Sequence, residues 1–224
     1  MNEKGKVIVI DGLDGCGKST QFELCTKKLE EMGKKIKSVS FPDYESPSSA
    51  LVKMYLAGEI AKTADEVNAY AASSFYAVDR YASYKTKWEK NYKNGEIILA
   101  GRYVSSNAIH QMCKLDDSEH DAYLDWLFDY EYEKLGLPKA NAVIFLDLPV
   151  EASQKLLSKR YEGDENKKDI HESNFEYMKK CRKNALYAAK KLGWTVIDCM
   201  ENENAIKSVE KINQEIMKVI SEVL

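Results

Sequence analysis

The chain has 224 residues, of which 31% are charged and 44% hydrophobic, and its formal net charge at pH 7 is −3. This length predicts a single domain, residues 1–224, and the balanced charge argues against a disordered chain or a broadly basic nucleic-acid surface. The apolar runs are far shorter than the roughly 20 residues that span a bilayer, and the N-terminus lacks the apolar core of a signal peptide. The five cysteines are scattered without a C-x-x-C pair, which favours reduced thiols. We therefore expect a cytoplasmic protein with no membrane and no nucleic-acid partner.

Short apolar, β-branched runs alternate with helix-length segments along the chain. The runs that predict strands are residues 6–11, 36–41, 97–100, 142–146 and 194–198. After the first run, apolar residues recur at helical spacing until Gly33, a glycine placed to cap the helix in a left-handed conformation. The last segment predicts an amphipathic helix whose apolar stripe comprises Ile206, Val209, Ile212, Ile216, Val219 and Val223. The alternation predicts an α/β fold of three layers, with a five-stranded parallel sheet flanked by helices on both faces.

The first predicted strand leads directly into a phosphate-binding sequence. Residues 12–19 read GLDGCGKS and fit the P-loop pattern G-x-x-x-x-G-K-[ST] between a buried strand and a helix start. The glycines let backbone N–H groups face an anion, and the helix that follows adds its positive N-terminal end. Lys18 is predicted to reach the β- and γ-phosphates and Ser19 to offer its hydroxyl to Mg²⁺, whereas an unliganded glycine-rich turn explains neither residue. The predicted ATP site comprises Gly12, Gly15, Cys16, Gly17, Lys18, Ser19 and Thr20.

A carboxylate inside the loop points to one class of P-loop enzyme. A P-loop alone does not name the phosphate acceptor, although the guanine-reading N-K-x-D motif of GTPases is absent. Residues 11–20, DGLDGCGKST, resemble the form found in the thymidylate kinase family, which transfers a phosphoryl group from ATP to dTMP. In that family the loop carboxylate, here Asp14, lies near the 3′-hydroxyl of the acceptor sugar and helps to orient the acceptor phosphate. The alternative is a solvated aspartate in a turn.

Two further segments resemble motifs of the same family. Residues 41–44, FPDY, are similar to the loop that closes over the acceptor monophosphate, although a proline at a strand end is ordinary. Residues 76–80, YAVDR, place Tyr76 and Arg80 on one helix face. The resemblance implies a ring that stacks on thymine and an arginine that contacts the base or the acceptor phosphate. Phe75 is an alternative stacking ring, and a core aromatic beside a surface arginine is the plain structural alternative.

The segment after the third predicted strand carries the longest match. Residues 102–111, RYVSSNAIHQ, resemble the family pattern D-R-Y-x-x-S-[NST]-x-A-Y-Q without its aspartate, and His110 replaces an aromatic that crowds the 2′ position of the sugar. The resemblance implies that Arg102 holds the acceptor phosphate, whereas the polar residues after it reach the base edge and the sugar. The implied dTMP site comprises Asp14, Phe41, Pro42, Tyr44, Tyr76, Arg80, Arg102, Ser106, Asn107, His110 and Gln111, with Lys18, Arg102 and Asp14 as the catalytic residues.

The metal site departs from the family pattern. Gly101 stands where the family usually has an aspartate tied to Mg²⁺ and its waters. Because Mg²⁺ keeps several waters and needs few direct protein ligands, another carboxylate at a strand end can take this role. The candidates are Asp11, Asp14 and Asp147.

The lid departs from the pattern as well. Gly15 occupies the P-loop position that carries a helper arginine in one branch of the family, which implies a helper in the lid. The polar stretch 158–173 is either that lid or an uneventful surface loop. It offers Arg160, which we assign to the ATP site because a lid-flanking arginine stacks on adenine in relatives. After Arg160 the lysines of this stretch are Lys167 and Lys168, and the alternative to a helper role is that both are solvated surface charges.

Taken over nearly the whole chain, the resemblance implies ATP and dTMP as substrates, Mg²⁺ as the cofactor and a homodimer formed through the helix at residues 69–84. Two other functions stay open. A deoxynucleoside kinase would need a carboxylate base near the sugar hydroxyl, and a nucleotide-binding protein without catalysis would fit Gly101 and the arginine-poor lid. The choice between dTMP and dUMP is also open, because small changes in a pocket alter discrimination by only about 1–3 kcal/mol.

Overall fold

A parallel sheet forms the centre of the computed structural model, which describes residues 4–63, 66–160 and 175–224. Its strand order is β2-β3-β1-β4-β5. All six residues of β1 are buried, and Val9 in its middle pairs with Ala100 of β3 on one side and Val143 of β4 on the other. The strands are β1 (Val7–Gly12), β2 (Ile36–Ser40), β3 (Ile97–Gly101), β4 (Ala142–Asp147) and β5 (Thr195–Asp198), which confirms the predicted five-stranded parallel sheet.

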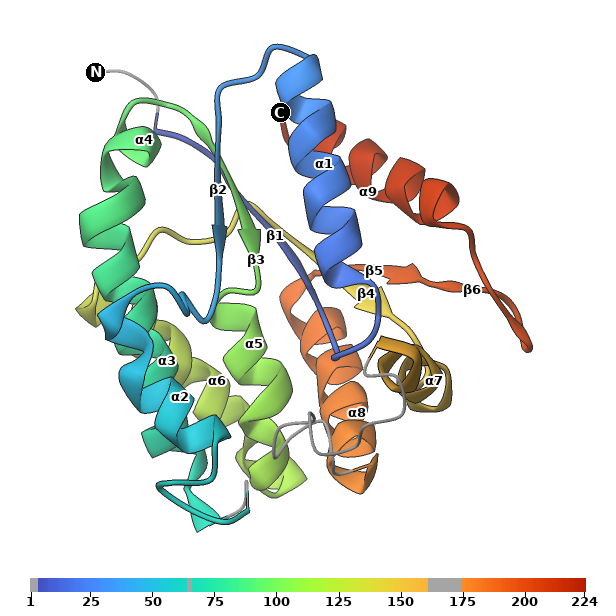
Figure 1. Cartoon of the computed structure of the whole chain (residues 1–224). Coiled ribbons are helices and arrows are strands. Elements are labelled where there is room, and N and C mark those ends of the chain that lie inside the picture. The colour runs from blue at the N-terminus through green and yellow to red at the C-terminus, as the bar shows by residue number, and fades with distance from the viewer. Residues whose placement is uncertain (1–3, 64–65, 161–174) are drawn as a thin grey trace.

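Helices cover both faces of the sheet (Figure 1). On one face α1 (Lys18–Glu31) contacts β1, β2 and β3, and α9 (Val209–Val223) contacts β4 and β5. On the other face lie α5 (Val104–His110) and α8 (Phe175–Leu192), and α3 (Ala69–Ser83) and α6 (His120–Phe128) pack against α5. The other α-helices are α2 (Ala50–Leu56), α4 (Glu89–Lys93) and α7 (Val150–Arg160). No helix among the described residues combines the length and the apolarity that crossing a membrane requires.

Short helical segments join these elements. Two of them are π-helical and continue a longer helix: η3 (Tyr84–Trp88) follows α3, and η6 (Asp129–Lys134) follows α6. Segments of 3₁₀ helix with described bounds include η1 (Pro47–Ser49), η4 (Met112–Lys114) and η5 (Asp117–Glu119). Because π-helical turns are rare and cluster at functional sites, η6 is of interest for the site described below.

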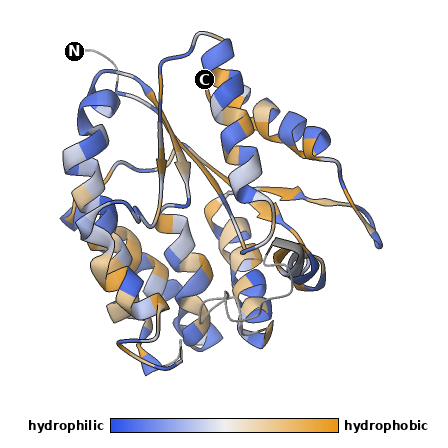
Figure 2. Ribbon diagram, viewed as in Figure 1, coloured by the Kyte–Doolittle hydropathy of each residue, from blue (hydrophilic) through white to orange (hydrophobic). Residues whose placement is uncertain are grey.

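Apolar side chains fill both interfaces between sheet and helices. Successive residues of a strand point to opposite faces, so Ile8 and Ile10 of β1 pack with Ile216 of α9, whereas Val7 and Val9 pack with the layer that contains α5. Figure 2 shows the result as hydrophobic strands in the centre and hydrophilic outer faces on the covering helices. The apolar runs that predict strands therefore form a sheet that is buried on both faces.

The C-terminal segment differs from its prediction. Ile206 does not belong to the last helix: it lies in β7 (Ala205–Ile206), which pairs antiparallel with β6 (Met200–Asn202), opposite Met200. The helix begins at Val209 because Ser208 caps it, with Ser208 Oγ accepting from the Lys211 N–H at 3.2 Å. The lid predicted at residues 158–173 lies outside the described residues except for its first three positions, which end α7.

Candidate active site

The P-loop connects β1 to α1, as its motif predicts. Gly17 has a left-handed φ of 88°, and α1 begins at Lys18. Ser19 and Thr20 are exposed in the first turn of the helix, where backbone N–H groups lack helical partners. Cys16 differs, because its side chain is buried in the core beneath the loop and its N–H donates to the Leu13 carbonyl at 3.3 Å. The exposed part of the loop is therefore built for an anion, and Cys16 supports it from below.

A side chain at position 15 is excluded by α7. Gly15 has a left-handed φ of 79°, and a Cβ there would lie 2.7 Å from the Ser153 carbonyl oxygen and 2.7 Å from Leu157 Cγ. The loop therefore cannot carry the helper arginine of the other family branch while α7 keeps this position. The residues that the sequence offers instead, Arg160, Lys167 and Lys168, have side chains outside the described part of the chain.

Three charged side chains meet at the P-loop. Arg102 Nη2 donates to Asp14 Oδ1 in a close ion pair, and Lys18 Nζ lies 3.7 Å from the same Oδ1. Lys18 Nζ also donates to the Leu13 carbonyl at 3.0 Å. Arg102 Nη1 also lies 3.5 Å from Asp11 Oδ1, so two cations and two carboxylates meet around the loop. The structure thus brings together the three residues predicted to be catalytic.

The Arg102 guanidinium is held in place from several sides. Its Nη1 donates to His110 Nε2 at 2.9 Å; since arginine only donates, the imidazole proton resides on Nδ1 in this contact. The backbone of Arg102 has a left-handed φ of 66°, an unusual conformation for a residue with a Cβ, and its N–H donates to the Ile10 carbonyl. Burial lowers the pKa of Arg102, but attraction from Asp14 and Asp11 more than offsets this and raises the pKa above its ordinary value. The group is therefore a permanent cation.

Two cavities meet at this cluster. The first lies between Arg102 and Arg80, and the second lies along the P-loop and the start of α1. Five residues line both: Asp14, Phe41, Pro42, Tyr44 and Arg102. Seven residues line the first alone: Leu56, Tyr76, Arg80, Ser106, Asn107, His110 and Gln111. The residues predicted from the sequence for dTMP therefore line one cavity together, with Leu56 as the one addition.

Three of these residues differ in how they meet the first cavity. Arg80 is 1% exposed, and its Nε and Nη2 donate to the Glu131 carboxylate, so it offers no unpaired charge to a phosphate. Ser106 Oγ donates to Asp11 Oδ2 at 2.7 Å, which directs the hydroxyl proton to β1. Tyr76, not Phe75, is the aromatic of this helix that lines the first cavity.

Sequence reasoning missed several residues that support the site. Asp79, inside the YAVDR segment, is buried and accepts from the Asp43 N–H at 2.8 Å and from Ser48 Oγ at 2.6 Å. Glu131 lies in η6 and is fully buried. The pattern around Asp79 contained a signal, namely a carboxylate next to Arg80 on the buried side of α3. No sequence signal marks Glu131, because its neighbours in η6 follow no motif.

Magnesium fits the second cavity through oxygen ligands. Ser19 and Glu23, four residues apart on α1, both line it, as does Gly101. A Cβ at Gly101 would lie 3.2 Å from Ser40 Oγ, which would have to move slightly, and 3.4 Å from Phe22 Cδ2, an ordinary contact. Among the residues that the structure describes, no group of three or more His, Cys, Asp or Glu is placed to hold a metal. Ser19 would hold a magnesium ion here through its hydroxyl.

All three carboxylates considered for metal-bound water have partners in the protein, and that of Asp14 is Arg102. The Asp11 carboxylate is buried and accepts from the Gly12 N–H at 2.8 Å and from Ser105 Oγ at 2.7 Å, in addition to Ser106. The Asp147 carboxylate accepts two hydrogen bonds from Arg182, at 2.7 and 2.9 Å. Asp14, whose side chain is 26% exposed at the junction of the two cavities, keeps access to solvent. Glu23 is a further carboxylate on the wall of the second cavity that the sequence did not single out.

Comparison with known proteins identifies the family. The family model of thymidylate kinase matches residues 10–213. The thymidylate kinase of Mycobacterium tuberculosis is 27% identical over 184 residues, covering 81% of this chain and 84% of that protein. The probable thymidylate kinase of Thermococcus onnurineus is 27% identical over 215 residues, covering 95% and 96%. The fold also matches a solved structure of thymidylate kinase from Candida albicans with a TM-score of 0.70 at 21% identity, covering 99% of this chain and 93% of that one. The chain therefore belongs to the thymidylate kinase family.

Proposed function

We propose that this protein transfers the γ-phosphoryl group of ATP to dTMP, giving ADP and dTDP. The observation that carries the proposal is the meeting of two cavities at Asp14 and Arg102. One cavity runs along a P-loop, which suits a triphosphate, and the other is lined by an aromatic ring and polar side chains, which suits a base and a sugar. A phosphate donor bound along the P-loop, in the second cavity, and an acceptor bound in the first cavity would meet phosphate to phosphate.

The mechanism needs alignment and positive charge rather than a general base. The acceptor is already a phosphate oxyanion, so no proton has to leave it before attack. Lys18 would neutralise the transferring phosphoryl group and Arg102 the acceptor phosphate, both close to Asp14. The Asp14 carboxylate holds the Arg102 guanidinium, and we assign it a positioning role toward the acceptor.

We assign the Mg²⁺ contact to Ser19, whose exposed hydroxyl lies on the wall of the second cavity. A bound magnesium ion would supply charge neutralisation between the β- and γ-phosphates. The carboxylates of Asp14 and Glu23 are the candidates on this wall to orient its waters.

A coupled assay of ADP release tests the proposal across dTMP, dUMP, the other nucleoside monophosphates and thymidine. We expect turnover with dTMP. Turnover with thymidine but not dTMP would establish a deoxynucleoside kinase, and binding of ATP without turnover of any acceptor would establish a nucleotide-binding protein that lacks catalysis. Either of the last two results would overturn the proposed function.

We further propose a homodimer formed through α3. Tyr70, Val78 and Tyr81 are exposed along one side of this helix, and Tyr70 packs edge-on against Trp126 of α6 with ring centroids 4.7 Å apart. Light scattering coupled to size exclusion tests this, with Val78→Glu expected to yield a monomer and Val209→Glu, an exposed position on α9, expected to leave the dimer intact. A monomeric wild-type protein would refute the proposal.

The five cysteines are all buried thiols, which supports a reducing compartment such as the cytoplasm.

A further inference from the structure

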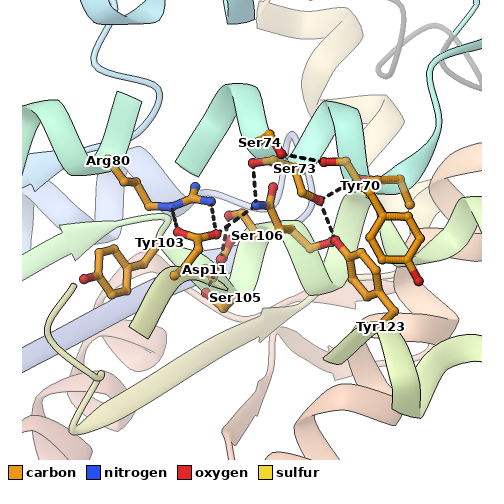
Figure 3. Close-up of polar contacts among 12 residues, drawn as sticks. Asp11, Tyr70, Ser73, Ser74, Arg80, Tyr103, Ser105, Ser106 and Tyr123 are labelled. Atoms are coloured by element: carbon orange, nitrogen blue, oxygen red, sulfur yellow. Dashed lines mark hydrogen bonds and ion pairs between the residues drawn. The ribbon is translucent and has the colours of Figure 1, made fainter. Parts of the chain in front are cut away.

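Glu131 is a fully buried carboxylate behind the first cavity. It accepts from Arg80 Nε at 2.7 Å and from Arg80 Nη2 at 2.6 Å, and its Oε1 also accepts from Asn107 Nδ2 at 3.0 Å. Figure 3 shows the paired contacts of Arg80 beside the polar network of α3. Arg80 and Asn107 both line the cavity, whereas Glu131 does not. One carboxylate therefore holds two residues of the cavity wall.

This pairing decides what Arg80 presents to a ligand. The two opposite charges of Arg80 and Glu131 cancel over a short distance in a buried setting, so the pair carries no net charge. Arg80 lines only the first cavity, whereas Arg102 lines both and stands next to the P-loop. The phosphate end of the first cavity is thus at Arg102, and the end at Arg80 is suited to an uncharged base.

The same contacts decide which atoms of Arg80 and Asn107 are left to bind that base. Asn107 Nδ2 donates to two acceptors, the Ser73 carbonyl at 3.2 Å and Glu131 Oε1, so the amide cannot turn around without losing both. Its Oδ1 accepts no hydrogen bond from a described group and can therefore accept one from a ligand. Likewise, Nη1 is the guanidinium nitrogen of Arg80 that makes no contact with Glu131. Arg80 Nη1 and Asn107 Oδ1 are thus the donor and the acceptor that these two wall residues have left for a ligand.

This pattern matches one class of pyrimidine. A 4-oxopyrimidine such as thymine has an acceptor at O4 and a donor at N3–H, whereas a 4-aminopyrimidine such as cytosine has a donor at N4 and an acceptor at N3. Resting on the proposed function, we propose that Glu131 is a positioning residue that sets the base selectivity, by orienting Arg80 as the donor to O4 and Asn107 as the acceptor from N3–H. Cytosine would meet a donor with a donor and an acceptor with an acceptor.

Substitution of Glu131→Gln tests this with little change in volume. The introduced side-chain amide offers an N–H donor, which lets the Asn107 amide turn and present Nδ2 to the cavity. We expect KM for dTMP to rise about tenfold or more, and the ratio of kcat/KM for dTMP over dCMP to fall by a similar factor, with KM for ATP nearly unchanged. The matched control is Glu133→Gln in the same π-helical segment, because its carboxylate is 57% exposed and pairs with the surface residue Lys139 at 2.8 Å.

A second variant separates positioning from folding. Glu131→Gln combined with Asn107→Asp keeps the total charge beside Arg80, lets the new amide donate to the new carboxylate, and leaves a fixed acceptor toward the cavity. We expect this double variant to regain most of the dTMP selectivity, and thermal melts of both variants will report how far each is folded. Equal changes in KM for ATP and dTMP, an unchanged dTMP to dCMP ratio in folded Glu131→Gln, or no rescue in a folded double variant would overturn the assignment. Absence of dTMP turnover in the wild-type protein would instead refute the proposed function.

Discussion

The Asp79 carboxylate on α3 accepts a hydrogen bond of 2.8 Å from the backbone N–H of Asp43, in the loop after β2. This contact joins the YAVDR segment to the FPDY segment, and Ser48 Oγ adds a second bond to the same carboxylate. Phe41 and Pro42, which line both cavities, are thereby held over the junction. One buried carboxylate thus makes two distant motifs into one wall of the site.

The first prediction removes this link. Asp79→Ala deletes two hydrogen bonds to a charged group, each worth about 1.5–3 kcal/mol, so we expect KM for dTMP to rise about tenfold or more. Thermal stability should fall as well, because the donors of Asp43 and Ser48 lose their partner. Ser48→Ala, which removes one bond and leaves the carboxylate, should have the smaller effect. Steady-state kinetics with dTMP varied measures both, and an unchanged KM for dTMP in Asp79→Ala would contradict the role.

The second prediction concerns the P-loop lysine. Lys18→Ala removes the cation beside the transferring phosphoryl group, and we expect kcat to fall by about 10³-fold, the size found when a preorganised charge-stabilising group is lost. The control is Lys28→Ala, an exposed lysine further along α1. Circular dichroism would verify that both variants fold. Near-normal turnover of Lys18→Ala would remove the lysine from the mechanism.

The third prediction distinguishes charge from shape at Arg102. Arg102→Ala should raise the activation free energy given by kcat/KM for dTMP by on the order of 2–4 kcal/mol, because a forked contact to a phosphate is lost. Arg102→Lys keeps a cation but not the fork, so its activity should lie between those of the wild type and the alanine variant. Initial rates under limiting dTMP measure the series. Equal activity of the lysine and alanine variants would show that charge alone contributes nothing there.

The fourth prediction compares two glycines of the site. Gly15→Ala places a Cβ against the Ser153 carbonyl and Leu157 in a left-handed backbone, and we expect a loss of about 1–3 kcal/mol in the free energy of unfolding. Gly101→Ala meets only side chains, with Ser40 Oγ at 3.2 Å, so its loss should be smaller. Urea denaturation measures both. The packing argument fails if Gly101→Ala is the less stable of the two.

The fifth prediction follows from the buried thiols. Burial raises the pKa of Cys25 to about 11 and that of Cys199 to about 12, and it raises the pKa of Cys16 above the ordinary 9.0. The reactive thiolate is therefore scarce at pH 8, and we expect a thiol reagent to modify these residues slowly until the chain is unfolded. Above pH 9 the unfolded thiols ionise while the folded ones keep their protons, so stability should fall as pH rises. Rapid labelling of the native protein at pH 8 would contradict this.

Local sequence determined much of the fold and of the site. The β-branched runs predict all five strands of the sheet because a strand buried on both faces must be apolar throughout. The glycines, lysine and serine of residues 12–19 predict the P-loop because backbone conformation and anion binding are local properties. The order of the later motifs names nearly every residue that lines the first cavity.

Only the tertiary structure decided which side chains pair. Arg80 and Glu131 are 51 positions apart, and the segment of Glu131 has no motif, so nothing local shows that the arginine is neutralised. The same holds for Asp11, a candidate for metal-bound water from its place at a strand end, which accepts hydrogen bonds from Ser105 and Ser106. Charges buried in a core must find partners wherever the chain brings them, because an unpaired buried charge costs several kcal/mol. The partner is therefore set by packing between distant elements, which periodicity and motif spacing do not encode.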